Sequence, residues 1–197
     1  MRTLEEALEY AQEGTLIKMC EGVHFSRATI KIGGIRIEPY YKDRAVYLLG
    51  DDGPTIKIDV PMVDSNDENE ATLKQVTIKR IVMAHNGEAI AKYFKELQLA
   101  KPDIHKRPNV KCLKDMKLEP AMNTIILINS GSLLLRNCLL TLQALPKDLT
   151  RKVPCLVSLP NTHLSIINCE FVGSKINLTT AIVTVNAASV VISMSRF

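Results

Sequence analysis

The chain has 197 residues, a formal net charge of +4, 46% hydrophobic residues, 5% aromatic residues and no Trp. This length is ample for one domain with a sizeable core, and the composition predicts that the core is aliphatic. A modest charge with so few aromatic side chains argues against nucleic-acid binding, which needs a clustered basic stripe and stacking rings. No apolar run approaches the length of a membrane span.

The first 14 residues predict an amphipathic helix of about three turns. Thr3 and Glu6 have the spacing of a capping box at its start, and Gly14 stands where a C-terminal cap belongs. The segment is acidic and lacks the apolar region of a signal peptide, so we interpret it as a helix that caps the core of the domain. One helical face carries only apolar side chains: Leu4, Ala7, Leu8 and Ala11.

Short strands are predicted after this helix. Most of them alternate apolar and polar side chains, as strands with one buried face do. Turns are indicated by Gly-Gly at 33–34, by the run from Gly50 to Pro54, and by residues 129–132. The strands in the first part of the chain cover residues 29–32, 35–38, 45–48 and 55–58.

Two segments interrupt the strand pattern, an acidic loop at residues 59–73 and an insertion at residues 87–121. Within the insertion, residues 88–99 predict a second helix, and a basic loop follows it. One interpretation of the insertion is purely structural: the helix packs on the side of the solenoid, and the basic stretch is a solvated loop. The functional interpretation is a surface that contacts an acidic partner, through Tyr93, Lys106, Arg107 and Lys111.

A motif of eight residues occurs three times, at 133–140, 164–171 and 190–197. Its first, third, sixth and eighth positions are apolar or small, whereas its second and seventh vary freely. The fifth position holds Asn137, then Asn168 31 residues later, then Met194 after 26 more. Residues 76–83 fit the same frame, with Arg80 at the asparagine position.

A further apolar strand precedes each copy of the motif, at 125–129, 156–160 and 182–186. The repeating unit therefore holds at least two strands separated by a bend. Repeats of this length, rich in Val, Ile and Leu and without a helical half, predict coils stacked by parallel pairing about 4.8 Å apart. The sequence thus predicts an all-β solenoid, a parallel β-helix of about five coils that occupies residues 1–197 as one domain.

The start of the chain resembles the opening of the pectin-lyase-like β-helices, in residues 3–8, 14–17, 21–24 and 35–37. His24 replaces the usual Tyr of that opening, and Glu21 the usual Pro. The pairs Asn137-Cys138 and Asn168-Cys169 are similar to the coil motif of this family. The resemblance implies a right-handed, single-stranded parallel β-helix with an N-terminal capping helix and a ladder of stacked asparagines at one bend.

The family includes lyases, hydrolases, esterases, adhesins and inactive scaffolds, so the activity has to be argued from residues. Lyase chemistry needs a stacked acidic cluster for calcium and a basic residue to take the proton, and only Lys79-Arg80 approaches the second requirement. Hydrolysis needs paired carboxylates, but Asp51-Asp52 has the composition of a turn. We therefore predict no catalytic residue, no metal site and no cofactor.

The cysteines bear on location. Their number is odd, five, and Cys138 and Cys169 occupy inward positions of the motif, where a free thiol acts as a small apolar group. Reduced cysteines favour a cytoplasmic protein, and a secreted, disulfide-bonded solenoid is the alternative.

The intracellular β-helices of F-box proteins and of SHC-binding, spindle-associated proteins resemble this chain in their Asn-Cys coils. This resemblance implies a non-enzymatic scaffold for protein partners, in a cytoskeletal or ubiquitin-ligase type of assembly. The alternative is a carbohydrate-active β-helix, a polysaccharide lyase or hydrolase, whose site would lie near Lys57, Lys79 and Arg80.

The last coil is the predicted docking surface for a protein partner. Phe197 aligns with Phe171 in the motif, so we expect it to point into the core, yet no later residue closes the coil. An open end exposes apolar side chains and strand edges, which invites pairing. Either a longer solenoid continues from this end, or the end docks on a partner through Met194, Arg196 and Phe197.

Overall fold

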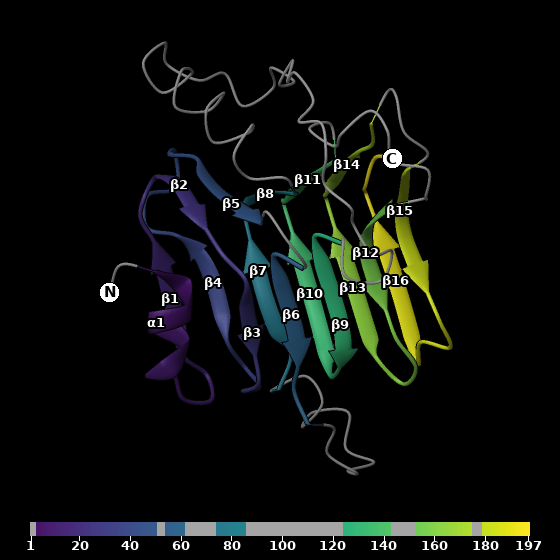
Figure 1. Cartoon of the computed structure of the whole chain (residues 1–197), viewed down its shortest axis with the longest axis horizontal. Helices are drawn as coiled ribbons and strands as arrows, with labels where there is room; N and C mark the ends of the chain where they lie inside the picture. The colour runs from purple at the N-terminus through teal and green to yellow at the C-terminus, as the bar shows by residue number, and fades with distance from the viewer. Residues whose placement is uncertain (1–2, 51–53, 62–73, 86–123, 143–152, 175–178) are drawn as a thin grey trace, which may run out of the picture.

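The computed structural model describes residues 3–50, 54–61, 74–85, 124–142, 153–174 and 179–197. The described strands form three sheets, which we name A, B and C, and every strand pair in them is parallel (Figure 1). Sheet A consists of β1 (Leu16–Met19), β4 (Arg36–Pro39), β7 (Val76–Lys79), β10 (Ser132–Arg136), β13 (His163–Ile167) and β16 (Ser189–Ser193). Sheet B consists of β2 (Gly22–Phe25), β5 (Val46–Gly50), β8 (Val82–His85), β11 (Leu139–Thr141) and β14 (Glu170–Val172). Sheet C consists of β3 (Ala28–Ile30), β6 (Ile56–Asp59), β9 (Ile126–Ser130), β12 (Val153–Ser158) and β15 (Thr179–Thr184).

The chain visits the sheets in the same cyclic order, A then B then C, and each strand pairs with its counterpart one round earlier. Such a path stacks coils by hydrogen bonds between strands about 4.8 Å apart. The architecture is consistent with a parallel β-helix, so the prediction of a mostly-β fold built from parallel strands is confirmed. The eight-residue motif itself contains two strands and the bend between them, so a coil has three strands, within the prediction of at least two.

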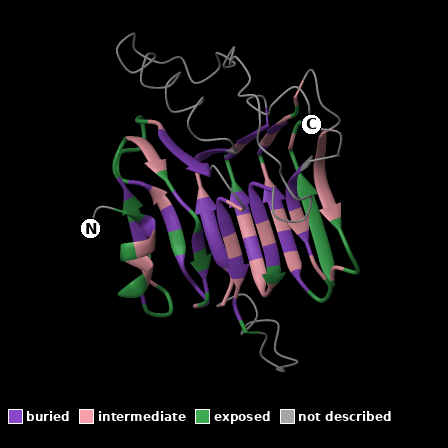
Figure 2. Ribbon diagram, in the orientation of Figure 1, coloured by how far each residue is buried: buried purple, intermediate pink, exposed green. Residues whose placement is uncertain are grey.

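The core is built from columns of equivalent side chains in successive coils. One column runs through sheet A, where strand register aligns the third motif position of every coil. All its members except the last are buried (Figure 2). Those from Ile37 to Ile166 have a coil on both sides, and Ile17 in the first coil lies in the same core cluster as Leu4. This column contains Ile17, Ile37, Ile78, Leu135, Ile166 and Ile192.

The connections from sheet A to sheet B, here called the A-to-B bends, are only two residues long in several coils, such as Asn137-Cys138 between β10 and β11. The first residue of the bend has a left-handed backbone, with φ near +50°, at Arg80, Asn137, Asn168 and Met194. Asn168 Nδ2 donates to Asn137 Oδ1 at 2.9 Å, so the predicted asparagine ladder is present. The second coil differs, because residues 40–45 separate β4 from β5.

Helix α1 (Leu4–Glu9) covers the N-terminal end of the core (Figure 1). Thr3 accepts a hydrogen bond from Glu6 N at 3.1 Å, as the capping prediction requires, and Leu4 is buried in the same cluster as the sheet residues. The helix is shorter than predicted. It ends well before Gly14, because Thr15 N donates to Gln12 O and the Thr15 hydroxyl accepts from Gln12 N in a separate turn.

None of the described helices has the length and hydropathy that a membrane span requires.

The boundary predicted for the acidic loop is wrong at its start. Asp59 is the last residue of β6, and Val60 is buried with 4% of its surface exposed. Both residues pack against the next coil, where Gly131 takes φ +93° and a Cβ at that position would lie 2.9 Å from Val60 Cβ. Residues 62–73 of the loop, and the whole insertion at 87–121, lie outside the described residues.

The terminal coil is open in this structure. Val190 and Ile192 continue two core columns, yet they are 39% and 45% exposed. Phe197 stacks on Phe171 with ring centroids 5.1 Å apart, but it is 67% exposed. The expectation that Phe197 points into the core is therefore wrong in part, because its outer face has no coil over it.

Candidate functional site

A groove follows the A-to-B bends from one coil to the next, and we call it the bend groove. Its volume is about 540 Å³. One end is walled by the longer loop of the second coil, with Lys42 and Arg44, and the other end by the terminal residues Met194 and Arg196. The bends of three intermediate coils, at residues 80–82, 137–139 and 168–170, line the part between. The groove therefore crosses five successive coils.

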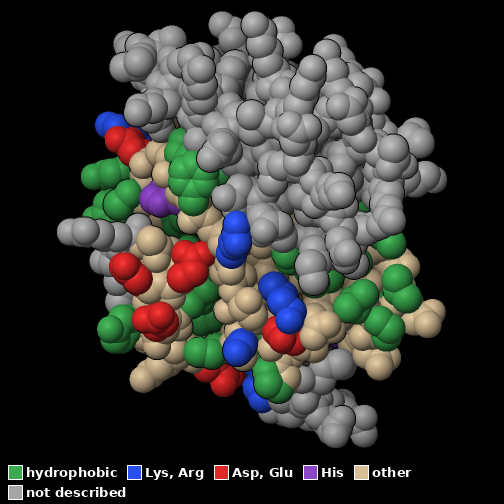
Figure 3. Space-filling model, viewed as in Figure 1, with side chains coloured by type: hydrophobic (Ala, Val, Ile, Leu, Met, Phe, Trp, Pro, Cys, Tyr) green, Lys and Arg blue, Asp and Glu red, His purple; other side chains and the backbone are tan. Residues whose placement is uncertain are grey.

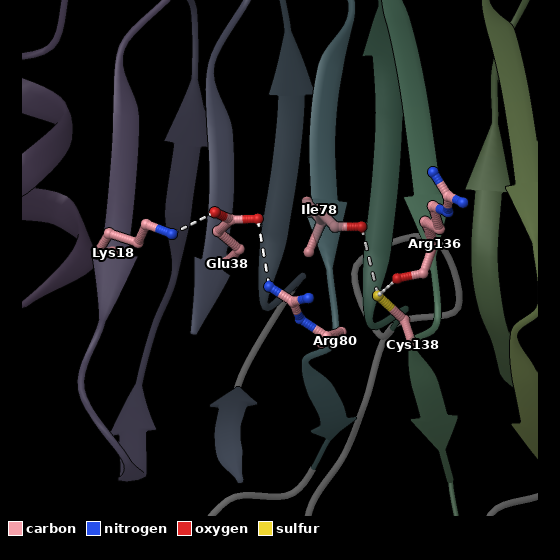
Figure 4. Close-up of polar contacts among 6 residues, drawn as sticks. All are labelled: Lys18, Glu38, Ile78, Arg80, Arg136 and Cys138. Atoms are coloured by element: carbon pink, nitrogen blue, oxygen red, sulfur yellow. Dashed lines mark hydrogen bonds and ion pairs between the residues drawn. The ribbon is translucent and has the colours of Figure 1, made fainter. Parts of the chain in front are cut away.

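In the middle of the groove, the two-residue bends at 137–138 and 168–169 carry neutral side chains. The Asn137 and Asn168 side chains lie in the ladder described above, and Cys138 and Cys169 follow them with 3% of their surfaces exposed. Figure 4 shows the Cys138 thiol donating to the carbonyl oxygens of Ile78 and Arg136, each at 3.4 Å. These contacts fix the thiol beneath the groove rather than in it.

The two thiols differ in their acidity. Burial raises the pKa of Cys138 well above its ordinary value. A hydrogen bond from Cys138 lowers the pKa of Cys169 to about 7. Burial likewise raises the pKa of Cys155 to about 12. The prediction of free, inward-facing thiols is confirmed for Cys138 and Cys169. Cys155 is also free and buried, while Cys20 is free and exposed.

Arg80 is held at the groove by the neighbouring coils. Figure 4 shows a chain of charges in which Lys18 contacts Glu38, and Glu38 contacts Arg80 with 3.5 Å between Oε2 and the guanidinium nitrogen. The hydrogen bond from Lys18 keeps the pKa of Glu38 below its ordinary value. Arg80 Nε is buried and has no hydrogen-bond partner in the structure.

Cations outnumber acids along the groove. Lys42, Arg44, Arg80 and Arg196 line it, against Asp43 and Glu170. On the face drawn in Figure 3, Lys and Arg side chains gather over the middle coils, and most Asp and Glu side chains lie toward the α1 end. Within the described ranges, no three His, Cys, Asp or Glu side chains group in a way that holds a metal ion.

The structure unites part of the predicted partner-binding set. Met194 and Arg196 line the bend groove, and Phe197 lies at the end of the same coil. Tyr93, Lys106, Arg107 and Lys111 lie outside the described residues. For the carbohydrate alternative, Arg80 lines the groove, whereas Lys57 lies in sheet C, where it pairs with Asp59 at 3.2 Å.

Sequence reasoning missed Lys42 and Arg44. Their loop carries no repeat motif. Only its length sets it apart in the sequence, because six residues, 40–45, connect two strands that are connected by two residues in other coils. Part of the hydrogen-bonding capacity of Arg44 is already used, because its guanidinium donates to Glu21 at 2.6 Å.

No family model, curated protein or solved structure matches this chain.

Proposed function

We propose that this protein is a non-enzymatic scaffold that binds protein partners along the bend groove of a right-handed, closed parallel β-helix. The observation that carries the proposal is the groove itself, which takes side chains from five successive coils. A ligand that contacts all of them is about 19 Å long, because the coils repeat every ~4.8 Å. An extended chain segment matches this shape.

The rigidity of the groove supports the same proposal. The bends that begin at Arg80, Asn137 and Asn168 are two residues long, their left-handed first residues leave little conformational freedom, and strand pairs fix both flanks. A preorganised surface loses little entropy when it binds. The resemblance to non-catalytic, intracellular pectin-lyase-like β-helices favours a cytoplasmic role in a larger assembly, of the cytoskeletal or ubiquitin-ligase type.

The terminal coil is a second proposed contact surface, next to one end of the groove. Met194 and Phe197 are 75% and 67% exposed, and Val191 on β16 is 55% exposed. A partner that covers these side chains together with Arg196 removes apolar area from water, which favours association at about 25 cal/mol per Å².

Site-specific photo-crosslinking in native lysate tests the proposal. A photoreactive amino acid replaces Lys42 or Glu170 in the groove, Met194 on the terminal coil, or Lys31 as a control beyond β3. We expect distinct protein adducts from the groove positions and from Met194, suppressed by an excess of the unlabelled protein. Adducts that are absent, or equally abundant from Lys31, contradict the scaffold. Adducts made of polysaccharide instead favour the carbohydrate alternative.

A further inference from the structure

We infer that the bend groove recognises an extended acidic peptide segment whose carboxylates stand about four residues apart. This inference rests on the proposed function, and it adds the chemistry of the partner. It follows from three features of the groove: the positions of its cations, the free hydrogen-bonding groups between them, and its apolar lining.

The cations that define the spacing are Arg80 and Arg196. Their bends are three coils apart, because those of Asn137 and Asn168 lie between them. Three coil spacings of ~4.8 Å give about 14 Å, and an extended peptide covers that distance in about four residues. Lys42 adds a positive charge beyond Arg80 at the second coil.

These cations have capacity left for a ligand. Arg80 has one long ion pair, at 3.5 Å to Glu38, and its side chain is one-third exposed, so its guanidinium has donors left for a ligand. Lys42 and Arg196 have no ion pair with any described residue, and the backbone of Arg196 is held by Cys169 O and Phe171 N at 2.9 Å. Arginine in a fixed position is well suited to a carboxylate, since its planar nitrogens donate in a fork.

The space between the cations suits a peptide backbone. The ladder uses Asn168 Nδ2 and Asn137 Oδ1, which leaves the Asn137 amide nitrogen and the Asn168 amide oxygen to pair with a ligand. Val82, Leu139 and Met194 supply apolar surface along the same stretch. A polyuronate has no apolar side chains to cover that surface, whereas a peptide of alternating acidic and apolar residues covers it.

Glu170 opposes the acidic ligand. It pairs with Arg196 in a parallel bridge of the backbone, and both side chains line the groove. A carboxylate at this place repels an incoming carboxylate, so Glu170→Gln is expected to tighten binding several-fold.

Fluorescence anisotropy with purified full-length protein tests the inference. The probe is a labelled nonapeptide with two glutamates separated by three residues and with valines between them, compared with its glutamine version. We expect the acidic peptide to bind at least tenfold more tightly, and the difference to shrink as salt is raised. Arg80→Gln and Arg196→Gln should each weaken binding about tenfold. Arg36→Gln removes the same charge from sheet A outside the groove and should leave binding unchanged.

The outcomes distinguish a failure of this inference from a failure of the proposed scaffold function. Equal binding of both peptides, or no loss in Arg196→Gln with an unchanged melting temperature, overturns the acidic partner. If groove crosslinks to proteins then persist, the scaffold stands and only the partner's chemistry is wrong. Tighter binding of oligogalacturonate than of the acidic peptide also overturns the inference, and it removes support from the protein scaffold as well.

Discussion

The first residue of four A-to-B bends has a left-handed backbone although none of these residues is glycine. This conformation costs most side chains roughly 1–2 kcal/mol, and asparagine tolerates it best. Asn137 and Asn168 therefore relieve strain and also join neighbouring coils through their amide hydrogen bond. Arg80 and Met194 occupy the same position without that advantage, which places strain at the two residues with which the column begins and ends.

Two substitutions at Asn168 separate these contributions. Asn168→Gly keeps the left-handed backbone but loses the ladder, so it should cost about 1 kcal/mol of unfolding free energy. Asn168→Ala loses the ladder hydrogen bond and also strains the left-handed backbone, so it should cost roughly 2–3 kcal/mol. Urea unfolding of the two variants beside the parent protein measures the difference. Equal losses in both variants would show that the ladder alone matters.

At the scale of the element, β6 is joined to β9 by a polar cluster at a break in strand register. Asp59 accepts from Asn129 at 2.7 Å and from Ser130 at 3.2 Å, and it pairs with Lys57 at 3.2 Å. The hydrogen bond from Asn129, followed by that of Lys57, lowers the pKa of Asp59. These side-chain contacts thus join the two strands at the point where the regular backbone pairing shifts its register.

The lowered pKa of Asp59 predicts a pH dependence of stability. Since the carboxylate is favoured in the folded state, its contribution is complete above the unfolded pKa of about 3.9 and is lost as the pH falls through the lower folded value. Asp59→Asn should therefore be less stable than the parent at pH 7, and the difference should disappear as the pH falls through the lowered folded-state pKa of Asp59. Chemical unfolding across this range checks it, and a constant gap would exclude the ionised carboxylate as the cause.

At the scale of the whole molecule, a coil is stabilised by the coils on either side of it. Stability in such solenoids is a sum of local and neighbour terms, so position along the stack decides what a side chain contributes. Ile166 lies between Leu135 and Ile192 and is fully buried, whereas Ile192 is covered on one side only.

This difference gives a matched pair of core substitutions. Ile166→Ala should cost about 2–4 kcal/mol, because it leaves a cavity between two coils. Ile192→Ala removes the same atoms from a half-exposed position and should cost less than about 1 kcal/mol. Thermal unfolding measures both. A large loss at Ile192 would mean that its outer side is covered in solution, by another coil or by a partner.

The sequence predicted the coil register because the motif repeats its apolar positions, and the pairing of Leu133 with Leu164 and then Val190 confirms the alignment. It predicted less of sheet B. Strands β11 and β14 have three residues each, too few for an alternation to be recognised. Irregular features of the site were also hidden, since the loop with Lys42 and Arg44 has no repeat partner with which it can be compared.

The alternation along each strand has a consequence for how this surface can change over evolution. Inward columns determine whether coils stack, while an outward column such as Leu134, Ser165 and Val191 carries unrelated chemistry from coil to coil. Outward side chains can therefore be exchanged one coil at a time without refolding the solenoid. A single backbone can in this way acquire a new specificity through substitutions that each leave its stability nearly untouched.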